Sequence, residues 1–126
     1  DYHRGCLLLA GREKLAGMPR ASQDVVVNVA GGGRVTEPAA DLGIVIATAS
    51  SYMDRPVPGD VLVLGEVGLT GEVRAVSGIE MRLKEAAALG FRRAVVPRNN
   101  VGDGARFPLE VRGVATVGDA LEALLG

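Results

Sequence analysis

The sequence of 126 residues contains no tryptophan, one cysteine and one histidine, and aromatic residues make up 3% of it. A single cysteine, Cys6, excludes an internal disulfide. Cys6 and His3 are too few for a structural zinc site, which needs four ligands. A Ser-His-Asp triad would have to use His3, which falls in a predicted helix and is a poor candidate. With so few aromatic residues, we expect the core to consist of Val, Leu, Ile and Ala.

Long apolar runs and a strong net charge are also missing. No apolar run approaches the ~18 residues of a membrane-spanning helix, and no signal peptide opens the chain, so we expect a cytoplasmic protein that does not enter a membrane. The formal net charge of −1 gives no bulk attraction toward nucleic acid. Because the sequence starts abruptly inside a predicted helix, we also expect it to be a fragment of a longer protein.

The charges that are present are unevenly distributed. Residues 1–73 carry 6 basic and 9 acidic side chains, a net of −3, whereas residues 74–126 carry 8 basic and 6 acidic side chains, a net of +2. Most of the positive excess lies between Arg74 and Arg98. Such a segment is typical either of a solvated helix face with arginines in adjoining loops or of a basic binding surface, and charge alone favours the first.

Hydrophobic periodicity and turn residues predict one α+β domain. Thr70 and Gly71 supply a tight turn, so the two strands on either side of it are expected to form a hairpin. Apolar residues cover nearly the whole circumference of one helix, which we therefore expect to be buried and central, in a sheet with antiparallel pairing. The predicted helices span residues 2–16, 38–53, 79–89 and a last segment after 116, and the predicted strands span residues 24–30, 61–67, 72–76, 93–97 and 109–114.

Local signals indicate where two of these helices begin. Thr36 can cap the helix that starts at Pro38, because a threonine hydroxyl accepts a hydrogen bond from a free N–H of the first turn. Asp41 lies in that first turn, where the positive end of the helix dipole favours an anion. Thr116 and Asp119 resemble a capping box for the last helix.

Motifs for nucleotide binding and nucleophilic catalysis are absent or incomplete. The sequence has no GxxxxGK[ST] loop, and the glycine triplet 31–33 lacks the third glycine of a dinucleotide fingerprint, so we interpret it as a turn or bulge. A serine–lysine dyad needs its hydroxyl and amine within roughly 3 Å of each other. Ser77 and Lys84 are about 10 Å apart along a helix and cannot meet within it. A long-range pairing of other serines and lysines stays open.

Three segments, EPAADLG, GEVGLTGEVRAV and SGIEMRLKEAAALGF, together resemble the proteolytic domain of the Lon protease family. In active members the first segment carries the nucleophilic serine in a Gly-Pro-Ser-Ala-Gly context, and a Gly-Gly pair precedes the helix with the catalytic lysine. The resemblance implies the ribosomal protein S5 domain 2-like fold of that family, an α+β fold with a mixed sheet and a buried central helix.

The resemblance places Ala39 at the position of the serine and Arg82 at the position of the lysine, with the 43-residue separation of the family's dyad. Alanine has no hydroxyl, and arginine stays protonated and cannot act as the general base. Lys84 lies on another face of the helix and cannot replace Arg82. Asp41 replaces a motif glycine. The resemblance therefore implies a degenerate dyad and a chain that is not an enzyme.

A closer resemblance covers essentially the whole chain. The strings VNVAGG, VTEPAADLG, DRPVP, GEVGLTGEVRAVS and EAAALGFRRAVVP, with an opening helix that begins DYHR, are similar to the C-terminal domain of the bacterial RadA (Sms) family. Members of that family are DNA repair and recombination ATPases with an N-terminal zinc finger, a RecA-like motor and this Lon-like domain. The resemblance implies that residues 1–126 are the Lon-like domain alone, without a cofactor or metal, and that ATP, Mg and Zn belong to the rest of the protein.

The same resemblance implies what the longer protein does. It would form a homo-hexameric ring that uses ATP to drive branch migration of recombination intermediates, with single-stranded or branched DNA and a RecA-type recombinase filament as partners. This domain would be an oligomerisation platform and a DNA-contacting surface. One alternative is a purely structural ring scaffold that does not contact DNA, and a less favoured one is an active Ser-Lys peptidase. The expected DNA-contacting residues are Arg34, Arg74, Arg92, Arg93 and Arg98.

Overall fold

The computed structural model describes Val26, Ala30 and residues 37–102 and 106–126. The helices predicted over residues 38–53 and 79–89 and the strands predicted over residues 93–97 and 109–114 are confirmed to within one residue at either end. In chain order the elements are η1 (Pro38–Ala40), α3 (Asp41–Met53), β1 (Val61–Val63), β2 (Glu66–Val67), β3 (Val73–Arg74), α4 (Ile79–Ala88), β4 (Arg93–Pro97), η2 (Arg98–Asn100), β5 (Glu110–Val114) and α5 (Val117–Leu125).

Predictions for the first part of the chain fall mainly outside the described residues. The predicted helix over residues 2–16 and the glycine triplet 31–33 lie there entirely and stay predictions. The predicted strand over residues 24–30 is described only at Val26 and Ala30, which are both helical, so the prediction is wrong at these two positions.

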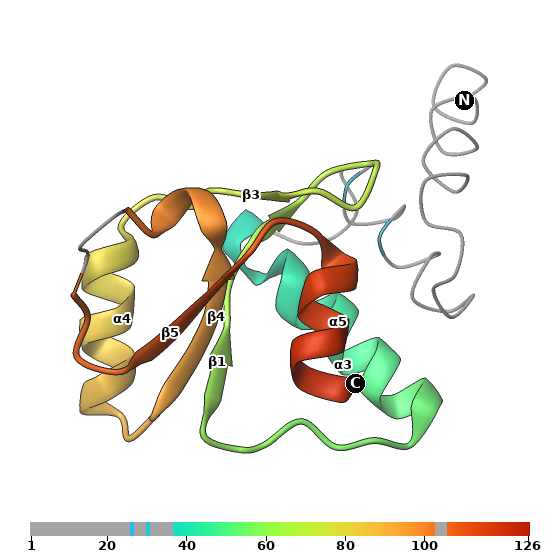
Figure 1. Ribbon diagram of the computed structural model, residues 1–126, viewed down its shortest axis with the longest axis horizontal. Coiled ribbons are helices and arrows are strands. Elements are labelled where there is room, and N and C mark those ends of the chain that lie inside the picture. Colours follow the sequence, from blue (N-terminus) through green and yellow to red (C-terminus); the bar gives the residue numbers. More distant parts are fainter. Residues whose placement is uncertain (1–25, 27–29, 31–36, 103–105) are drawn as a thin grey trace.

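The middle layer is a three-stranded sheet in the order β1-β4-β5, and both of its strand pairs are parallel. Helix α4 lies on one side of this sheet, and α3 and α5 lie on the other (Figure 1). Strands β2 and β3 form a separate antiparallel pair. The antiparallel pairing that we expected is therefore confirmed for the hairpin and wrong for the larger sheet. Helix α4 lies in the connection between β1 and β4, and such a crossover is what lets two strands run in parallel.

The single strand predicted over residues 61–67 is two strands in different sheets, with Gly65 between them. The Gly65 N–H donates to the carbonyl of Ala39 at 3.0 Å, and the Gly65 carbonyl accepts from the N–H of Leu42 at 3.0 Å. A Cβ atom at position 65 would lie 2.7 Å from Cγ1 of Val73. The chain leaves the parallel sheet here because its backbone groups bind the start of α3, at a distance that a side chain would prevent.

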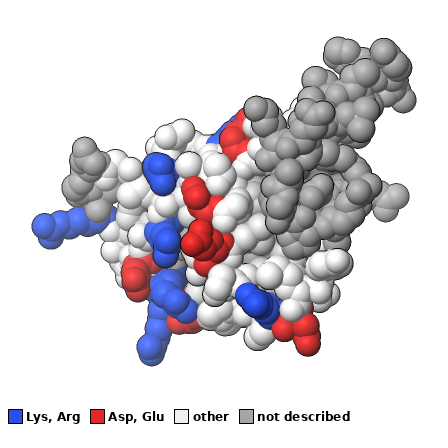
Figure 2. All heavy atoms as spheres, turned by 45° about the vertical axis from the view of Figure 1, so that its right-hand side comes forward, with Lys and Arg blue, Asp and Glu red and all other residues white. Residues whose placement is uncertain are grey.

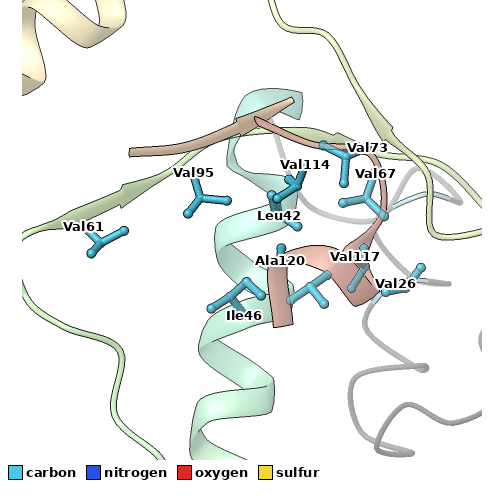
Figure 3. Packing of buried hydrophobic residues seen from close by; sticks show 11 residues of the cluster. Val26, Leu42, Ile46, Val61, Val67, Val73, Val95, Val114, Val117 and Ala120 are labelled. Carbon is cyan, nitrogen blue, oxygen red and sulfur yellow. The ribbon is translucent and has the colours of Figure 1, made fainter. Parts of the chain in front are cut away.

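The core consists of two clusters, one on each side of the sheet. The larger one joins the sheet to α3 and α5 and includes Leu42, Val95 and Val117, all of which are buried (Figure 3). The smaller one joins the sheet to α4, with Leu83 fully buried against Val96 and its neighbours. As predicted, the core side chains are Val, Leu, Ile and Ala.

Helix α3 is not buried on all sides, contrary to our expectation. Leu42 and Val45 are fully buried, but Ile44 is 37% exposed and Tyr52 is 63% exposed. Ala47 is also exposed. The sequence hides this asymmetry because the outer face of the helix carries small and apolar residues instead of charged ones. Hydrophobic periodicity needs polar residues on one face to reveal which side is solvated.

The predicted cap at Thr116 is confirmed, whereas the Asp119 carboxylate binds the N–H of the residue before the cap instead of the N–H of Thr116. The N–H of Asp119 donates to Oγ1 of Thr116 at 3.0 Å, and the Asp119 carboxylate accepts from the N–H of Ala115 at 3.2 Å. At the other predicted cap, Thr36 lies outside the described residues. There Glu37 is the N-cap residue of η1, and its side chain accepts from the N–H of Ala39.

Candidate functional site

The two dyad positions of the Lon resemblance are joined through one carboxylate. Oε1 of Glu37 accepts a hydrogen bond from the Ala39 N–H at 3.4 Å and one from Nη2 of Arg82 at 3.1 Å. Glu37 precedes η1, and Arg82 lies in the first turns of α4. Residues 43 positions apart in the sequence therefore belong to one cluster, which we call the Glu37 cluster: Glu37, Ala39, Ser77 and Arg82.

The backbone positions Arg82 within this cluster. Nε of Arg82 donates to the Ser77 carbonyl at 2.8 Å. Gly78, at the N-cap of α4, has φ of +68°, a left-handed conformation that favours glycine. The chain thus folds back at Gly78, so that the Ser77 carbonyl faces the side chain of a residue one turn into the helix. Two of the three guanidinium nitrogens are thus engaged, Nε by a carbonyl and Nη2 by a carboxylate.

The chemistry available to the cluster is limited. Ala39 is 2% exposed and has no side-chain functional group. The Arg82 guanidinium binds Glu37 as a fixed cation and does not accept a proton at biological pH. Lys84 is exposed on α4, and no described hydrogen bond or ion pair connects it to the cluster. The arrangement can hold η1 against α4, and it offers no nucleophile at position 39.

Asp41 is the buried polar residue of the described core, with 4% exposure. Its Oδ2 accepts a hydrogen bond from the N–H of Val67 at 3.1 Å, which ties β2 to the start of α3. Burial raises the pKa of this carboxyl above its usual range, the Val67 hydrogen bond opposes the rise, and the negative charge of Glu66 adds to it. Sequence analysis placed Asp41 in the first helical turn correctly but did not foresee its burial.

Three of the predicted DNA-contacting arginines lie around β4. Arg92 and Arg93 are at the start of this strand, whereas Arg98 follows its end. Five residues of a strand span about 16 Å. Arg98 therefore lies at the opposite end of β4 from the other two.

The segment that follows Arg74 contacts η2, which begins with Arg98, so Arg74 lies near the same end of β4 as Arg98. The side chain of Asn100 accepts a hydrogen bond from the Val76 N–H at 2.9 Å and donates one to the Val76 carbonyl at 3.0 Å. These two hydrogen bonds hold Val76, just after the hairpin, beside η2. The predicted arginines thus form two groups, Arg74 with Arg98 and Arg92 with Arg93, while Arg34 lies outside the described residues.

Acidic partners neutralise one arginine in each group. Nη2 of Arg74 lies 3.2 Å from Glu72, and Nη2 of Arg93 lies 3.1 Å from Asp60. The hydrogen bond from Arg93 lowers the pKa of the Asp60 carboxyl. On the face shown in Figure 2, the described Lys and Arg side chains are interspersed with Asp and Glu. The local field at these arginines is therefore weaker than their number indicates.

Sequence analysis missed two charged residues. Glu37 bridges the dyad positions, and its only sequence signal was its place beside Pro38. Arg112, on β5, lines a cavity of about 110 Å³ together with Arg93, Val95 and Leu124. The cavity lies between the sheet and α5. Side chains two positions apart in a strand share a face, so Arg112 and Glu110 lie on the same face of β5.

Two further observations concern only the described residues. They contain no group of three or more His, Cys, Asp or Glu side chains that could hold a metal ion. None of the described helices has the length and apolar character needed to cross a membrane.

Comparison with known proteins places the chain in a family. The sequence profile of the family described as "Subunit ChlI of Mg-chelatase" matches residues 13–100. This match covers more than half of the 126 residues, and the chain belongs to this family.

Among individual proteins, the chain is similar to several that are named "DNA repair protein RadA". It is 52% identical to those of Halalkalibacterium halodurans and Bacillus subtilis over all of its own length, and 47% identical to that of Escherichia coli over 96%. The chain spans 28% of the length of the first two relatives and 26% of the third. The similarity to RadA that we identified from the sequence strings is confirmed at this level.

Proposed function

We propose that the chain is a DNA-contacting, non-proteolytic domain of a DNA repair protein. The observation that carries this proposal is the 52% identity over the whole chain to relatives named for DNA repair. In this proposal the domain has the Lon-type, ribosomal protein S5 domain 2-like fold and performs no chemistry of its own. It serves as a platform on which copies of the longer protein assemble and as a surface that contacts DNA.

The absence of peptidase activity is supported by the Glu37 cluster. At position 39 there is no hydroxyl, and the cation at position 82 is held by Glu37 at 3.1 Å. A Ser-Lys peptidase needs a neutral amine beside a hydroxyl at these places. Incubation with casein should therefore give no cleavage above buffer, and a serine-directed phosphonate probe should label no serine. Specific labelling of Ser77 or any other serine would show that the peptidase alternative is correct.

Restoring the two dyad residues sharpens this test. The variant Ala39→Ser with Arg82→Lys should remain inactive, because Glu37 and Asp41 put negative charge beside the place where an oxyanion would develop. Adding Glu37→Gly and Asp41→Gly removes both carboxylates. Activity that appears only in this fourfold variant would identify the carboxylates as the second barrier, provided that circular dichroism shows a folded protein.

DNA contact is supported by the arginines at the two ends of β4. Phosphate groups are recognised by guanidinium groups, and each neutralised phosphate adds to the salt dependence of binding. A fluorescent duplex and a single-stranded oligonucleotide should bind weakly to the isolated chain, with an affinity that falls as salt rises. Copies assembled in a ring should bind more strongly, because one DNA molecule then meets several equivalent surfaces.

The division of the arginines into two groups allows them to be tested separately. Arg74→Glu with Arg98→Glu alters the group near the end of β4. Arg92→Glu with Arg93→Glu alters the group at its start. Lys84→Glu on α4 is the control, with half the change of charge of either pair, at a place away from both groups. A loss of DNA affinity confined to one pair would identify the DNA-contacting group of arginines. Equal affinities for all three variants at low salt would favour the scaffold without DNA contact.

We assign the remaining properties to the longer protein. By its resemblance to RadA it would be a cytoplasmic, hexameric, DNA-dependent ATPase that drives branch migration beside a RecA-type filament. Its ATP, Mg and Zn sites would lie outside this chain. Calorimetry of the chain with ATP and magnesium should accordingly give no heat of binding, and micromolar affinity would contradict this assignment.

A further inference from the structure

Strand β5 is an edge of the parallel sheet, because the strand order is β1-β4-β5. The Glu110 N–H donates to the Arg92 carbonyl at 3.1 Å. In a parallel ladder alternate residues point their N–H and C=O groups to the same side. Glu110, Arg112 and Val114 therefore bond toward β4, whereas the N–H and C=O groups of Val111 and Gly113 point to the outside.

No strand among the described residues pairs with this outer side. An edge strand presents unpaired N–H and C=O groups, so it readily pairs with another strand. Two charged side chains on this edge strand also lack partners of opposite charge among the described residues. Glu110 and Arg112 are exposed, and neither has an ion-pair partner among the described residues. Val111 is half-buried on the opposite face, against the cluster under α4.

The order of these residues is self-complementary. A two-fold axis through Val111 would pair β5 antiparallel with β5 of a second copy. Glu110 would then lie opposite Arg112 of the partner, and Arg112 opposite Glu110. Because Val111 points its backbone groups outward, the two Val111 residues would exchange both N–H···O bonds. The charged residues would form the closer, non-hydrogen-bonded pairs, with Cα atoms about 4.5 Å apart.

We propose that the β5 edge is a two-fold interface through which two copies of this chain join their sheets. The two three-stranded sheets would become one continuous six-stranded sheet with two cross-strand ion pairs, one on each side of the axis. The charges select this arrangement over its alternatives. In-register parallel pairing would set Glu110 beside Glu110 and Arg112 beside Arg112, and like charges directly opposite are destabilising. The interface specifies one contact of the assembly platform in the proposed function. Its test uses neither DNA nor a peptidase substrate, so its failure is distinguishable from a failure of the proposed DNA contact.

A charge-swap cycle tests the pairing directly. Sedimentation velocity over a range of protein concentrations gives the dimer dissociation constant of the unaltered chain at low salt. Arg112→Glu alone, or Glu110→Arg alone, turns both ion pairs into like-charge contacts and should raise this constant about tenfold or more. The double variant Glu110→Arg with Arg112→Glu restores opposite charges across the axis and should recover the original constant. Lys84→Glu, on the far side of α4, should leave it unchanged.

Mixing the two single variants gives a second readout. Each variant alone should dimerise more weakly than the unaltered chain, but their mixture should form heterodimers, because arginines at 110 and 112 of one copy then face glutamates of the other. In a Cys6→Ser background, a Glu110→Cys chain mixed with an Arg112→Cys chain should form a disulfide faster than either chain does alone, which reports the register. Circular dichroism establishes that each variant is folded. A monomeric unaltered chain at every concentration, or a mixture that behaves like its components, would overturn the proposal.

Discussion

Two carboxylates that contact the β2–β3 hairpin, Asp41 at the start of α3 and Glu72 in the hairpin turn, differ in the direction of their pKa shifts. Asp41 holds β2 to the start of α3 and is almost fully buried. Glu72 lies in the turn that precedes β3, where it accepts hydrogen bonds from the N–H and the hydroxyl of Thr70 at 3.1 and 2.7 Å. It also binds Nη2 of Arg74 at 3.2 Å. The pKa of Asp41 is raised, whereas the pKa of Glu72 is lowered.

The comparison shows that the balance between burial and hydrogen-bond donors decides the direction of a carboxyl's pKa shift. Loss of water raises the pKa of both carboxyls and is the largest single influence on each. At Asp41 the Val67 N–H alone opposes it, and the charge of Glu66 works the other way. At Glu72 the hydrogen bonds from Thr70 and Arg74 together outweigh the loss of water. A buried carboxylate with one donor favours its protonated form, and a carboxylate with several donors favours its charged form.

The largest effect in this comparison is expected from Asp41→Ala. This change leaves the buried Val67 N–H without its acceptor, which should lower the free energy of unfolding by about 1–3 kcal/mol. Asp41→Asn keeps an oxygen at the same place and avoids burying a charge, so it should be neutral or stabilising at pH 7. Urea unfolding followed by circular dichroism measures both. If the alanine variant is as stable as the asparagine variant, the hydrogen bond does not hold this junction.

The pH dependence of Asp41 follows from the direction of its shift. A raised pKa in the folded state means that Asp41 contributes most stability below its ordinary value of 3.8. This contribution is lost as the pH rises through the higher pKa of the folded state. The free energy of unfolding of the unaltered chain should therefore fall relative to Asp41→Asn as the pH increases from 3.8. A difference that does not vary with pH would contradict the raised pKa.

A smaller effect with the opposite pH dependence is expected at Glu72. Its folded-state pKa is lowered, so its contribution is present above the ordinary value of 4.5 and is lost as the pH falls through the folded-state pKa. Glu72→Gln should destabilise the chain by about 0.5–1 kcal/mol at neutral pH, since the site is partly exposed and screened by water. Below the folded-state pKa the two proteins should converge. Urea unfolding at a series of pH values gives this curve, with Glu80→Gln on α4 as the control.

The ion pair of the Glu37 cluster should contribute less than about 1 kcal/mol, because 57% of the Glu37 side chain and 32% of the Arg82 side chain are exposed. A double-mutant cycle with Glu37→Gln and Arg82→Gln isolates the coupling between them. We expect a small favourable coupling that decreases in high salt. A coupling of zero at low salt would mean that the two side chains do not hold η1 against α4.

The smallest effect on stability is expected for Asp60 and Arg93, at the start of β4. The hydrogen bond from Arg93 lowers the pKa of Asp60, so its contribution should be present above 3.8 and lost as the pH falls further. Asp60→Asn should change stability at neutral pH less than any of the substitutions above. NMR titration of the Asp60 carboxyl, with and without Arg93→Gln, measures the shift directly. If Arg93→Gln leaves the pKa of Asp60 unchanged, the hydrogen bond from Arg93 is not the cause of its lowering.

The accuracy of sequence-based prediction differed between local and long-range features. The capping of α5 by Thr116 was predicted correctly, because Thr116 and Asp119 lie within one turn. The bounds of β4 were also predicted correctly from a short apolar run. The direction in which β4 pairs was not, since an apolar run does not specify whether its neighbours run parallel or antiparallel. The break of the strand at Gly65 depends on contacts with Ala39 and Leu42, more than twenty positions away.

The sequence by itself determined the helices of residues 38–53 and 79–89, the strands β4 and β5, the cap of the last helix, the apolar makeup of the core and the similarity to RadA. These features depend on residue type, spacing and short-range periodicity. Only the tertiary structure decided which face of α3 is solvated, that one carboxylate joins Ala39 to Arg82, and that Arg74 and Arg93 lie near opposite ends of β4. It also decided that Asp41 is buried with a single donor, because desolvation depends on which distant segments pack over a residue.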